Sequence, residues 1–476
     1  MMELLLEAGA RVDIKNPAGQ TALDLARVPT HTLRKYSGTP DRALTRQKPF
    51  NAVRSTGDSS RCSTIRCIRV DQPHRPHTMN TRWLLSILVL STTVLASAVI
   101  PTGAQPPPGP VRGPAHGDGG VSDFYAWKEK VPRVPGRLLR QEPLPDQLML
   151  TNAAKGLRVL YTSTDGINGK SPIAVSGAIY LPKGTPPAGG WPIVAWAHGT
   201  TGTADVCAPS WMERGTRDTD YLNAWLGQGY AVVASDYQGL GTPGGHPWMA
   251  VRPEGWSVLD SVRSALRAFP ELANAVVIVG QSQGSHAALS ATGLAPRYAP
   301  ALRIKGTVAT GVAGPLYAAS RRTTALLFLL LHKFQAMDPA FRPSDYLTEE
   351  GERGYAAAAS TCVRPGPVVP LDPLLKAWPD HAKIPAVEDW PTLHFTHPVF
   401  IGTGLADTAG LPAVQYATAA AACRAGTIVE THYYPGQDHG GTVNASLVDS
   451  LPFVAKLFAG LPVPGNCATL KPPPTN

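Results

Sequence analysis

Five residues near the middle of the chain, Gly280-Gln281-Ser282-Gln283-Gly284, have the G-x-S-x-G spacing of a nucleophile elbow. In such an elbow a sharp turn between a strand and a helix raises the serine hydroxyl above the sheet. An apolar run at residues 275–280 comes directly before the motif, and a helical pattern at 283–292 comes directly after it. A chain with 46 glycines can contain this motif by chance, but the context makes Ser282 the candidate nucleophile.

A serine hydroxyl attacks when a histidine removes its proton and a carboxylate holds that histidine in the right tautomer. The expected chain order is serine, acid, histidine. Of ten histidines after residue 104, His439 lies in the loop after the last predicted strand, whereas His432 lies inside that strand. His439 is therefore the candidate base, and Asp407, directly after the seventh predicted strand, is the candidate acid. Asp438 is the rival acid but would have to fold back onto the neighbouring ring, and Asp407 could instead cap a helix.

The tetrahedral intermediate of such a reaction needs two backbone N–H donors for its oxyanion. One is expected from Gln283, and the other from the loop after the third predicted strand, which reads His198-Gly-Thr-Thr-Gly. We predict the amide of Thr200, with that of Thr201 as the alternative. His198 is expected to support this loop rather than to act as a base.

The elements that must hold these residues alternate between strands and helices. Strands are predicted at residues 157–164, 173–181, 192–197, 230–236, 275–280, 304–310, 398–403 and 428–434, and helices at 220–228, 256–268 and 283–292. The later strands are continuous Val/Ile/Ala runs, as in a parallel sheet buried on both faces. The predicted fold is an α/β-hydrolase fold with an eight-stranded, mainly parallel sheet formed by residues 123–312 and 397–468, in which the nucleophile follows the fifth strand.

Residues 313–396 interrupt the alternation and contain no convincing core strand. A structureless loop of this length is uncommon in a compact domain, so we predict a helical cap. Its most apolar run, Ala325–Leu331, is predicted to be a buried helix of the cap. The same helix could also meet lipid or line an acyl tunnel, since the two roles do not exclude each other.

The first 122 residues differ from the rest. Residues 1–78 combine a single ankyrin-like fragment with a basic, aperiodic segment, and residues 79–104 have the charge, apolar run and small-residue exits of a secretory signal peptide. A membrane anchor is the alternative reading of that run. Our hypothesis is that translation starts at Met79 and that the product is secreted. Residues 105–122 and 469–476 are predicted to be tails.

Composition and charge limit the kinds of molecule that the protein is expected to bind. The apolar fraction of 43% and the charged fraction of 16% indicate a globular protein. Residues 1–78 carry +6 of the formal net charge of +9, and the chain after residue 104 carries +2, so nucleic acid is not an expected partner. Four cysteines after residue 104, Cys207, Cys362, Cys423 and Cys467, show no metal-binding spacing and allow two disulfides in three pairings. No cofactor, metal ion or obligate protein partner is expected.

Six motifs occur in order along residues 120–465: His198-Gly-Thr-Thr-Gly, Asp205-Val-Cys-Ala-Pro-Ser210, Asp236-Tyr-Gln-Gly-Leu-Gly-Thr-Pro-Gly-Gly-His-Pro247, the elbow, Gly404-Leu-Ala-Asp407 and Gly436-Gln-Asp-His439. Together they resemble the secretory lipase family of fungi and bacteria. The resemblance implies triacylglycerol lipase or carboxylesterase activity, export, a small-molecule ester or lipid as substrate with transient contact to a lipid interface, and a helical cap before the catalytic acid.

The resemblance also implies details of the site. It suggests a Cys207–Cys362 bridge between core and cap, which leaves Cys423 to pair with Cys467. It places residues 236–247 near the mouth of the site, where Tyr237 and Trp248 would either line the substrate pocket or pack in the core. Residues 1–78 have no counterpart in the family.

Three alternatives to a secreted ester hydrolase remain open from the sequence. The same triad serves peptidases and acyltransferases. The chain could also be an ankyrin-type binding protein with a dead hydrolase domain, although the complete triad argues against loss of activity. Finally, residues 83–100 could tether the protein to a membrane.

Overall fold

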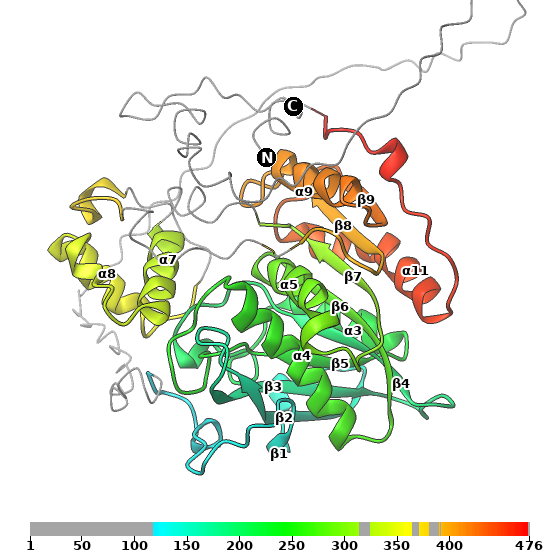
Figure 1. Cartoon of the computed structure of the whole chain (residues 1–476), viewed down its shortest axis with the longest axis horizontal. Helices are drawn as coiled ribbons and strands as arrows, with labels where there is room; N and C mark the ends of the chain where they lie inside the picture. Colours follow the sequence, from blue (N-terminus) through cyan, green and yellow to red (C-terminus); the bar gives the residue numbers. More distant parts are fainter. Residues whose placement is uncertain (1–117, 314–323, 364–370, 380–389, 391, 475–476) are drawn as a thin grey trace, which may run out of the picture. The chain divides into compact units, whose positions relative to one another are not determined.

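The computed structural model describes residues 118–313, 324–363, 371–379, 390 and 392–474 (Figure 1). The ankyrin-like fragment, the basic segment, the signal peptide at 79–104 and most of the tail at 105–122 lie outside the described residues. So do the proposed start at Met79 and several stretches of the predicted cap.

The described residues form a mostly parallel sheet with helices on both faces, which confirms the predicted α/β class. The strands are β1 Leu138–Pro143, β2 Ala153–Thr164, β3 Pro172–Pro182, β4 Trp191–Ala197, β5 Ala231–Ser235, β6 Leu272–Gln281, β7 Ile304–Thr310, β8 Val399–Gly404 and β9 Val429–Tyr434. Their order in the sheet is β1-β2-β3-β5-β4-β6-β7-β8-β9. The pairs from β1 to β5 are antiparallel, and those from β5 to β9 are parallel.

The sheet has nine described strands, so the predicted count of eight was wrong by one. The additional strand, β1, is an edge strand that pairs with β2 alone. Its sequence, LLRQEP, shows neither an apolar run nor a regular alternation, and it ends at Pro143. Proline is tolerated at an edge because one side of the strand needs no ladder hydrogen bonds. The nucleophile consequently follows the sixth strand of the structure rather than the fifth.

Alternate residues of β4 show how the sheet divides the core into two layers. Ile193 and Ala195 pack into a cluster with helices α4 (Val251–Ala268) and α5 (Gln283–Tyr298). Val194 and Trp196 pack into a second cluster with α3 (Thr216–Gly227) and α11 (Leu447–Phe458). This alternation follows from the two-residue period of a strand. Figure 1 shows α4 and α5 lying beside one another across the sheet.

Two more helices follow the last parallel strands. Helix α9, Pro412–Arg424, lies between β8 and β9, and the short helix α10, Gly441–Ala445, follows β9. The loops that precede α9 and α10 therefore leave the sheet at the carboxyl ends of adjacent strands. Single turns of 3-10 helix occur at Asp123–Tyr125, Asp146–Leu148, Asp205–Cys207, Pro343–Asp345, Asp372–Leu374 and Cys467–Thr469.

Between β7 and β8, the described residues of 313–396, called here the insertion, contain helices but no strand of the sheet. Helix α7, Thr324–Met337, includes the predicted apolar helix, and α8 spans Glu349–Ala358. The apolar side chains of α7 pack with residues such as Phe341 and Leu347 into a small core of the insertion. No helix in the described part of the chain is long and apolar enough to cross a membrane.

Two disulfides form, with the pairing that the resemblance implies. Cys207–Cys362 joins the segment after β4 to the insertion, and Cys423–Cys467 joins the end of α9 to the C-terminal segment. The first bridge closes a loop of 155 residues, and the second closes a loop of 44. A cross-link of this kind stabilises the native state mainly by restricting the unfolded chain.

We predict that replacing Cys423 and Cys467 together by serine lowers the free energy of unfolding by about 3 kcal/mol, because the unfolded C-terminal segment regains the freedom of an open loop. Urea denaturation of the double variant and the wild type measures the difference. Equal midpoints and slopes for the two proteins would contradict it.

Candidate active site

Ser282 lies at the turn between β6 and α5 in a backbone conformation that side chains rarely adopt. Its φ is 58° and its ψ is −120°. A non-glycine residue in such a conformation costs free energy and persists only where its surroundings hold it. Here the Ser282 amide donates to the carbonyl of Thr310 at 3.0 Å, and the Ser282 carbonyl accepts from the amide of Ser285 at 2.9 Å. Hydrogen bonds to β7 and within the first turn of α5 therefore hold Ser282 in this strained conformation.

The two glycines of the motif are required by close contacts between backbone segments. A Cβ at position 280 would overlap the carbonyl of Gly284, and a Cβ at position 284 would overlap the carbonyl of Ala197 at the end of β4. The elbow is consequently packed directly against the strand that leads into the His198–Gly202 loop. This contact brings the predicted nucleophile and the predicted oxyanion loop together.

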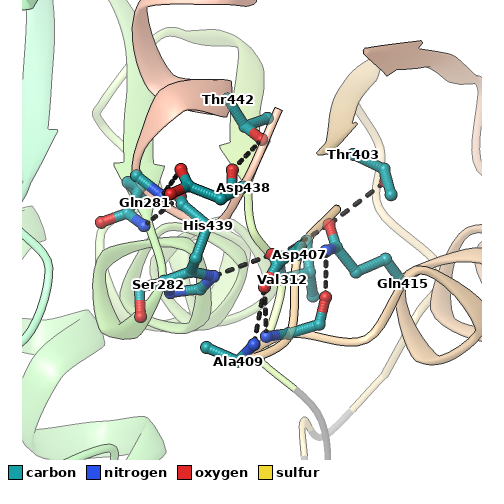
Figure 2. Close-up of polar contacts among 12 residues, drawn as sticks. Gln281, Ser282, Val312, Thr403, Asp407, Ala409, Gln415, Asp438, His439 and Thr442 are labelled. Atoms are coloured by element: carbon teal, nitrogen blue, oxygen red, sulfur yellow. Dashed lines mark hydrogen bonds and ion pairs between the residues drawn. The ribbon is translucent and has the colours of Figure 1, made fainter. Parts of the chain in front are cut away.

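Asp407 and His439 meet at the carboxyl ends of β8 and β9. The His439 Nδ1–H group donates to Asp407 Oδ2 at 2.8 Å. The His439 ring also faces Gly311, where a Cβ would lie 3.0 Å from its Cε1 atom, and Gly311 directly follows the residue that holds the Ser282 amide. Figure 2 shows the dashed contact between His439 and Asp407, with Ser282 labelled in the same view. The structure thus pairs the predicted base with the predicted acid and sets the His439 ring against Gly311, next to the residue that binds the elbow.

The rival acid, Asp438, has another role. Its Oδ1 atom accepts hydrogen bonds from the amides of Gly440 and Gly441 at 3.1 and 2.7 Å, and its carbonyl accepts from the hydroxyl of Thr442. Figure 2 shows this contact with Thr442. Asp438 therefore shapes the turn that carries His439 and does not pair with the imidazole.

Four donors surround the buried carboxylate of Asp407. The amides of Ala409 and Gly410 donate to Oδ1, each at 2.8 Å, while His439 and the Gln415 side chain donate to Oδ2. Gln415, on α9, is fully buried, and its own oxygen accepts from the amide of Val312. We did not predict a role for Gln415. The one signal in the sequence was a single amide among the alanines of α9.

The two predicted oxyanion donors, the amides of Thr200 and Gln283, have no acceptor among the described residues. The Thr200 hydroxyl accepts from the indole Nε1–H of Trp248 at 3.1 Å. The carbonyl of Thr201, the alternative donor residue, accepts from the amide of Val363 in the insertion. Thr200 is therefore held by its hydroxyl and Thr201 by its carbonyl. Neither contact uses the backbone N–H group that an oxyanion would need.

His198 is buried, and its Nδ1 atom lies 2.7 Å from the carbonyl oxygen of Gly199. Burial lowers the pKa of His198, so the ring is neutral. It stacks on the ring of Tyr237 with centroids 4.3 Å apart, and the Tyr237 hydroxyl donates to the His198 carbonyl. This arrangement agrees with a supporting role for His198.

The structure places both of the suggested pocket residues in buried clusters. Tyr237 is fully buried in the large cluster under α4 and α5, which agrees with core packing, the second of its two predicted roles. Trp248 is also buried, but it packs against Met249 and Leu329 of α7. It touches the oxyanion loop and the insertion at once.

A polar network that we did not predict lies behind Gln283. The Gln283 side-chain nitrogen donates to Glu254 Oε1 at 2.8 Å and to His246 Nε2 at 2.9 Å, and His286 Nδ1 lies 2.9 Å from Glu254 Oε2. Burial lowers the pKa of His246 to about 4, so His246 is neutral and its Nδ1–H donates to the carbonyl of Gln238. Within the described ranges, no group of three or more His, Cys, Asp or Glu side chains is placed to hold a metal ion.

Known proteins share both sequence and fold with this chain. The family model described as "Secretory lipase" matches residues 215–363, which hold the elbow and helices α7 and α8. Lipase A of Moesziomyces aphidis is 30% identical over 184 residues, which cover 36% of this chain and 38% of that protein. The resemblance to secretory lipases is confirmed. Lipase 7 of Candida albicans is 35% identical over 92 residues, or 19% of this chain and 21% of that protein. The chain thus spans less than two-fifths of the length of either of these two lipases.

Solved structures extend the likeness to the whole fold. Candida antarctica lipase A in its closed state superposes with a TM-score of 0.59 at 20% identity, over 74% of this chain and 89% of that one. The rice cell wall degrading esterase LipA from Xanthomonas oryzae gives 0.51 at 16% identity, over 69% and 98%. At these identities the likeness establishes the fold, and it is the predicted α/β-hydrolase fold.

The contacts of Gln415 predict a measurable effect on the reactivity of Ser282. Gln415→Leu removes a donor from Asp407 and leaves the Val312 amide unpaired, so the His439–Asp407 pair is held less well. We expect the rate constant for labelling of Ser282 by a fluorophosphonate to fall about tenfold. Gln228→Leu, at an exposed position after α3, serves as the control and should label at the wild-type rate.

The buried, neutral His246 predicts a dependence of stability on pH. Its pKa falls from 6.5 in the unfolded chain to about 4 in the native state, so the unfolded state binds the additional proton between these values. The stabilisation is complete well above pH 6.5 and is lost as the pH falls towards 4, by about 1.5 kcal/mol between pH 6.5 and 5. Urea denaturation at both pH values should show a smaller loss for His246→Gln than for the wild type. Equal losses would show that His246 does not titrate in this way.

Proposed function

We propose that this protein is a serine hydrolase of carboxylic esters, acylglycerols included, which acts through a Ser282–His439–Asp407 triad and an acyl-enzyme. The observation that carries the proposal is the strained Ser282 elbow beside a His439–Asp407 pair that is already joined by a hydrogen bond of 2.8 Å. The likeness to secretory lipases in sequence and to a lipase and an esterase in fold supports the choice of an ester as substrate.

The first half of the reaction forms the acyl-enzyme. His439 takes the proton of the Ser282 hydroxyl as the serine oxygen bonds to the ester carbonyl carbon. Asp407 accepts from Nδ1–H and stabilises the imidazolium that results. The carbonyl oxygen becomes an oxyanion and accepts hydrogen bonds from the amides of Gln283 and Thr200, with Thr201 as the alternative donor. When the tetrahedral intermediate collapses, the carbon–oxygen bond to the alcohol breaks and His439 gives its proton to the leaving oxygen.

The second half repeats these steps with water. His439 removes a proton from water, whose oxygen bonds to the acyl carbon, and the same amides stabilise the second oxyanion. The bond to Ser282 then breaks, the serine recovers its proton from His439, and the carboxylic acid leaves. Each half leaves His439 neutral, and the whole cycle restores the Ser282 hydroxyl while one ester and one water molecule become an alcohol and a carboxylic acid.

We assign the insertion at 313–396 as a cap over this site and the core as residues 123–312 and 397–468. The Cys207–Cys362 bridge and the hydrogen bond from the Val363 amide to the Thr201 carbonyl tie the insertion to the oxyanion loop, which supports this assignment. The substrate of a capped site of this kind would be a small-molecule ester or a lipid. The two disulfides and the likeness to secretory lipases support export, for which residues 79–104 would serve as the signal peptide.

The direct test is hydrolysis of p-nitrophenyl esters of increasing acyl length by the wild type and by Ser282→Ala. The variant lacks the nucleophile, so we expect turnover to fall by about 10³-fold or more while the unfolding midpoint is retained. Ser360→Ala, at an exposed serine of the insertion, should behave as the wild type. Activity of Ser282→Ala within tenfold of the wild type would overturn the proposal, and preferential cleavage of peptide substrates would reassign the triad to a peptidase.

A further inference from the structure

Residues 246–249, called here the bridging segment, lie in the connection between β5 and α4. They contact the loop after β4 and helices α4, α5 and α7. Met249 has a φ of 52°, in the left-handed region that favours glycine. A long side chain tolerates this conformation only where neighbouring contacts fix the backbone. The amide of Trp248 also donates to the carbonyl of His246 at 2.9 Å, which closes the segment into a tight turn.

One side of the bridging segment holds the residue after the nucleophile. The side-chain nitrogen of Gln283 donates both to His246 and to Glu254. The same Glu254 oxygen accepts from the amide of Met249 at 2.7 Å, and the Glu254 side chain is completely buried. Gln283 and Met249 are therefore fixed to a single carboxylate oxygen. The backbone amide of Gln283 is one of the two donors that we assign to the oxyanion.

The other side of the bridging segment holds the second donor residue. The indole Nε1–H of Trp248 donates to the hydroxyl of Thr200 at 3.1 Å. Trp248 is buried against Leu329 of helix α7. The position of Thr200, and with it the direction of its backbone amide, thus depends on how α7 is seated.

Lys333 of the same helix completes the arrangement. Its side chain is entirely buried, and its Nζ atom donates to the carbonyl of Met249 at 3.0 Å. The two backbone polar groups of Met249 are therefore bound by opposite charges, the amide by Glu254 and the carbonyl by Lys333. The ammonium also lies near enough to His246 to lower the pKa of that ring. Burial of a lysine is costly unless its charge is used.

We infer that Lys333 is a positioning residue for the oxyanion hole: through Met249 it sets the bridging segment, which in turn orients Thr200 and Gln283. The inference rests on the proposed function and deepens it. The insertion then does more than cover the site, because one of its helices fixes the geometry that stabilises the transition state. An oxyanion hole is sensitive to displacements well below the size of an atom, since its donors must lie 2.7–3.1 Å from the developing charge.

The test uses Lys333→Met in the full chain, with Lys376→Met, at an exposed lysine of the insertion, as the matched control. We expect kcat to fall about tenfold and KM to stay within about twofold, because the lost interaction acts on the transition state. The inhibition constant of an alkyl boronic acid, whose tetrahedral adduct on Ser282 places an oxygen in the hole, should rise by the same factor. Complete labelling by a fluorophosphonate shows that the measured population is folded.

A second measurement avoids the buried charge. Trp248→Phe and Thr200→Val each remove one partner of the side-chain hydrogen bond and keep both oxyanion amides in the chain. If this bond orients the hole, each variant lowers kcat several-fold and the double variant falls no further, since both remove the same interaction. Multiplicative losses in the double variant would overturn this part of the inference.

The outcomes separate the inference from the proposed function. The inference alone is overturned if Lys333→Met keeps the wild-type kcat and the wild-type affinity for the boronic acid. It is also overturned if the loss of activity equals the fraction of protein that the fluorophosphonate fails to label, because the variant is then only partly folded. A wild-type protein that neither hydrolyses esters nor reacts with the fluorophosphonate overturns the proposed function, and the inference with it.

Discussion

The close contact of the elbow with the end of β4 is the constraint on which the rest of the site depends. Gly284 can approach the Ala197 carbonyl, and Gly280 the Gly284 carbonyl, because neither has a Cβ. This approach forces Ser282 into its strained conformation and sets the start of α5 beside the loop that follows β4. The absence of a Cβ at these two glycines thus places the proposed nucleophile and both proposed oxyanion donors relative to one another.

The fold and the pairing of His439 with Asp407 could be predicted because their signals are local or follow chain order. The apolar strands can be recognised directly in the sequence, and Ser282, Asp407 and His439 each follow one of them. Strand β1 could not be recognised because an edge strand needs no continuous apolar face. Gln415 could not be recognised either, because its role depends on the side chain of Asp407, which only the folded chain brings to it.

The same reasoning explains why the role of Tyr237 stayed open and the network behind Gln283 was not predicted. A tyrosine near the mouth of a site has the same pattern in sequence whether it faces a cavity or the core, and only the structure shows that its neighbours bury it. Glu254, His246 and Gln283 are separated by up to 37 residues and meet only through tertiary packing. Their polarity gave no hint of burial, since polar residues are mostly exposed.

In helix α7, apolar packing and one buried polar contact have different roles in fixing the helix against the core. Leu327, Leu330 and Phe334 are buried in the core of the insertion, which accounts for the apolar run as packing rather than as an exposed surface. Apolar contacts alone would tolerate a helix shifted by one turn, because leucines recur along it. Such a shift would separate the ammonium of Lys333 from the Met249 carbonyl and break this buried hydrogen bond. The lysine therefore selects one seating of α7, and that seating is the one in which Trp248 reaches Thr200.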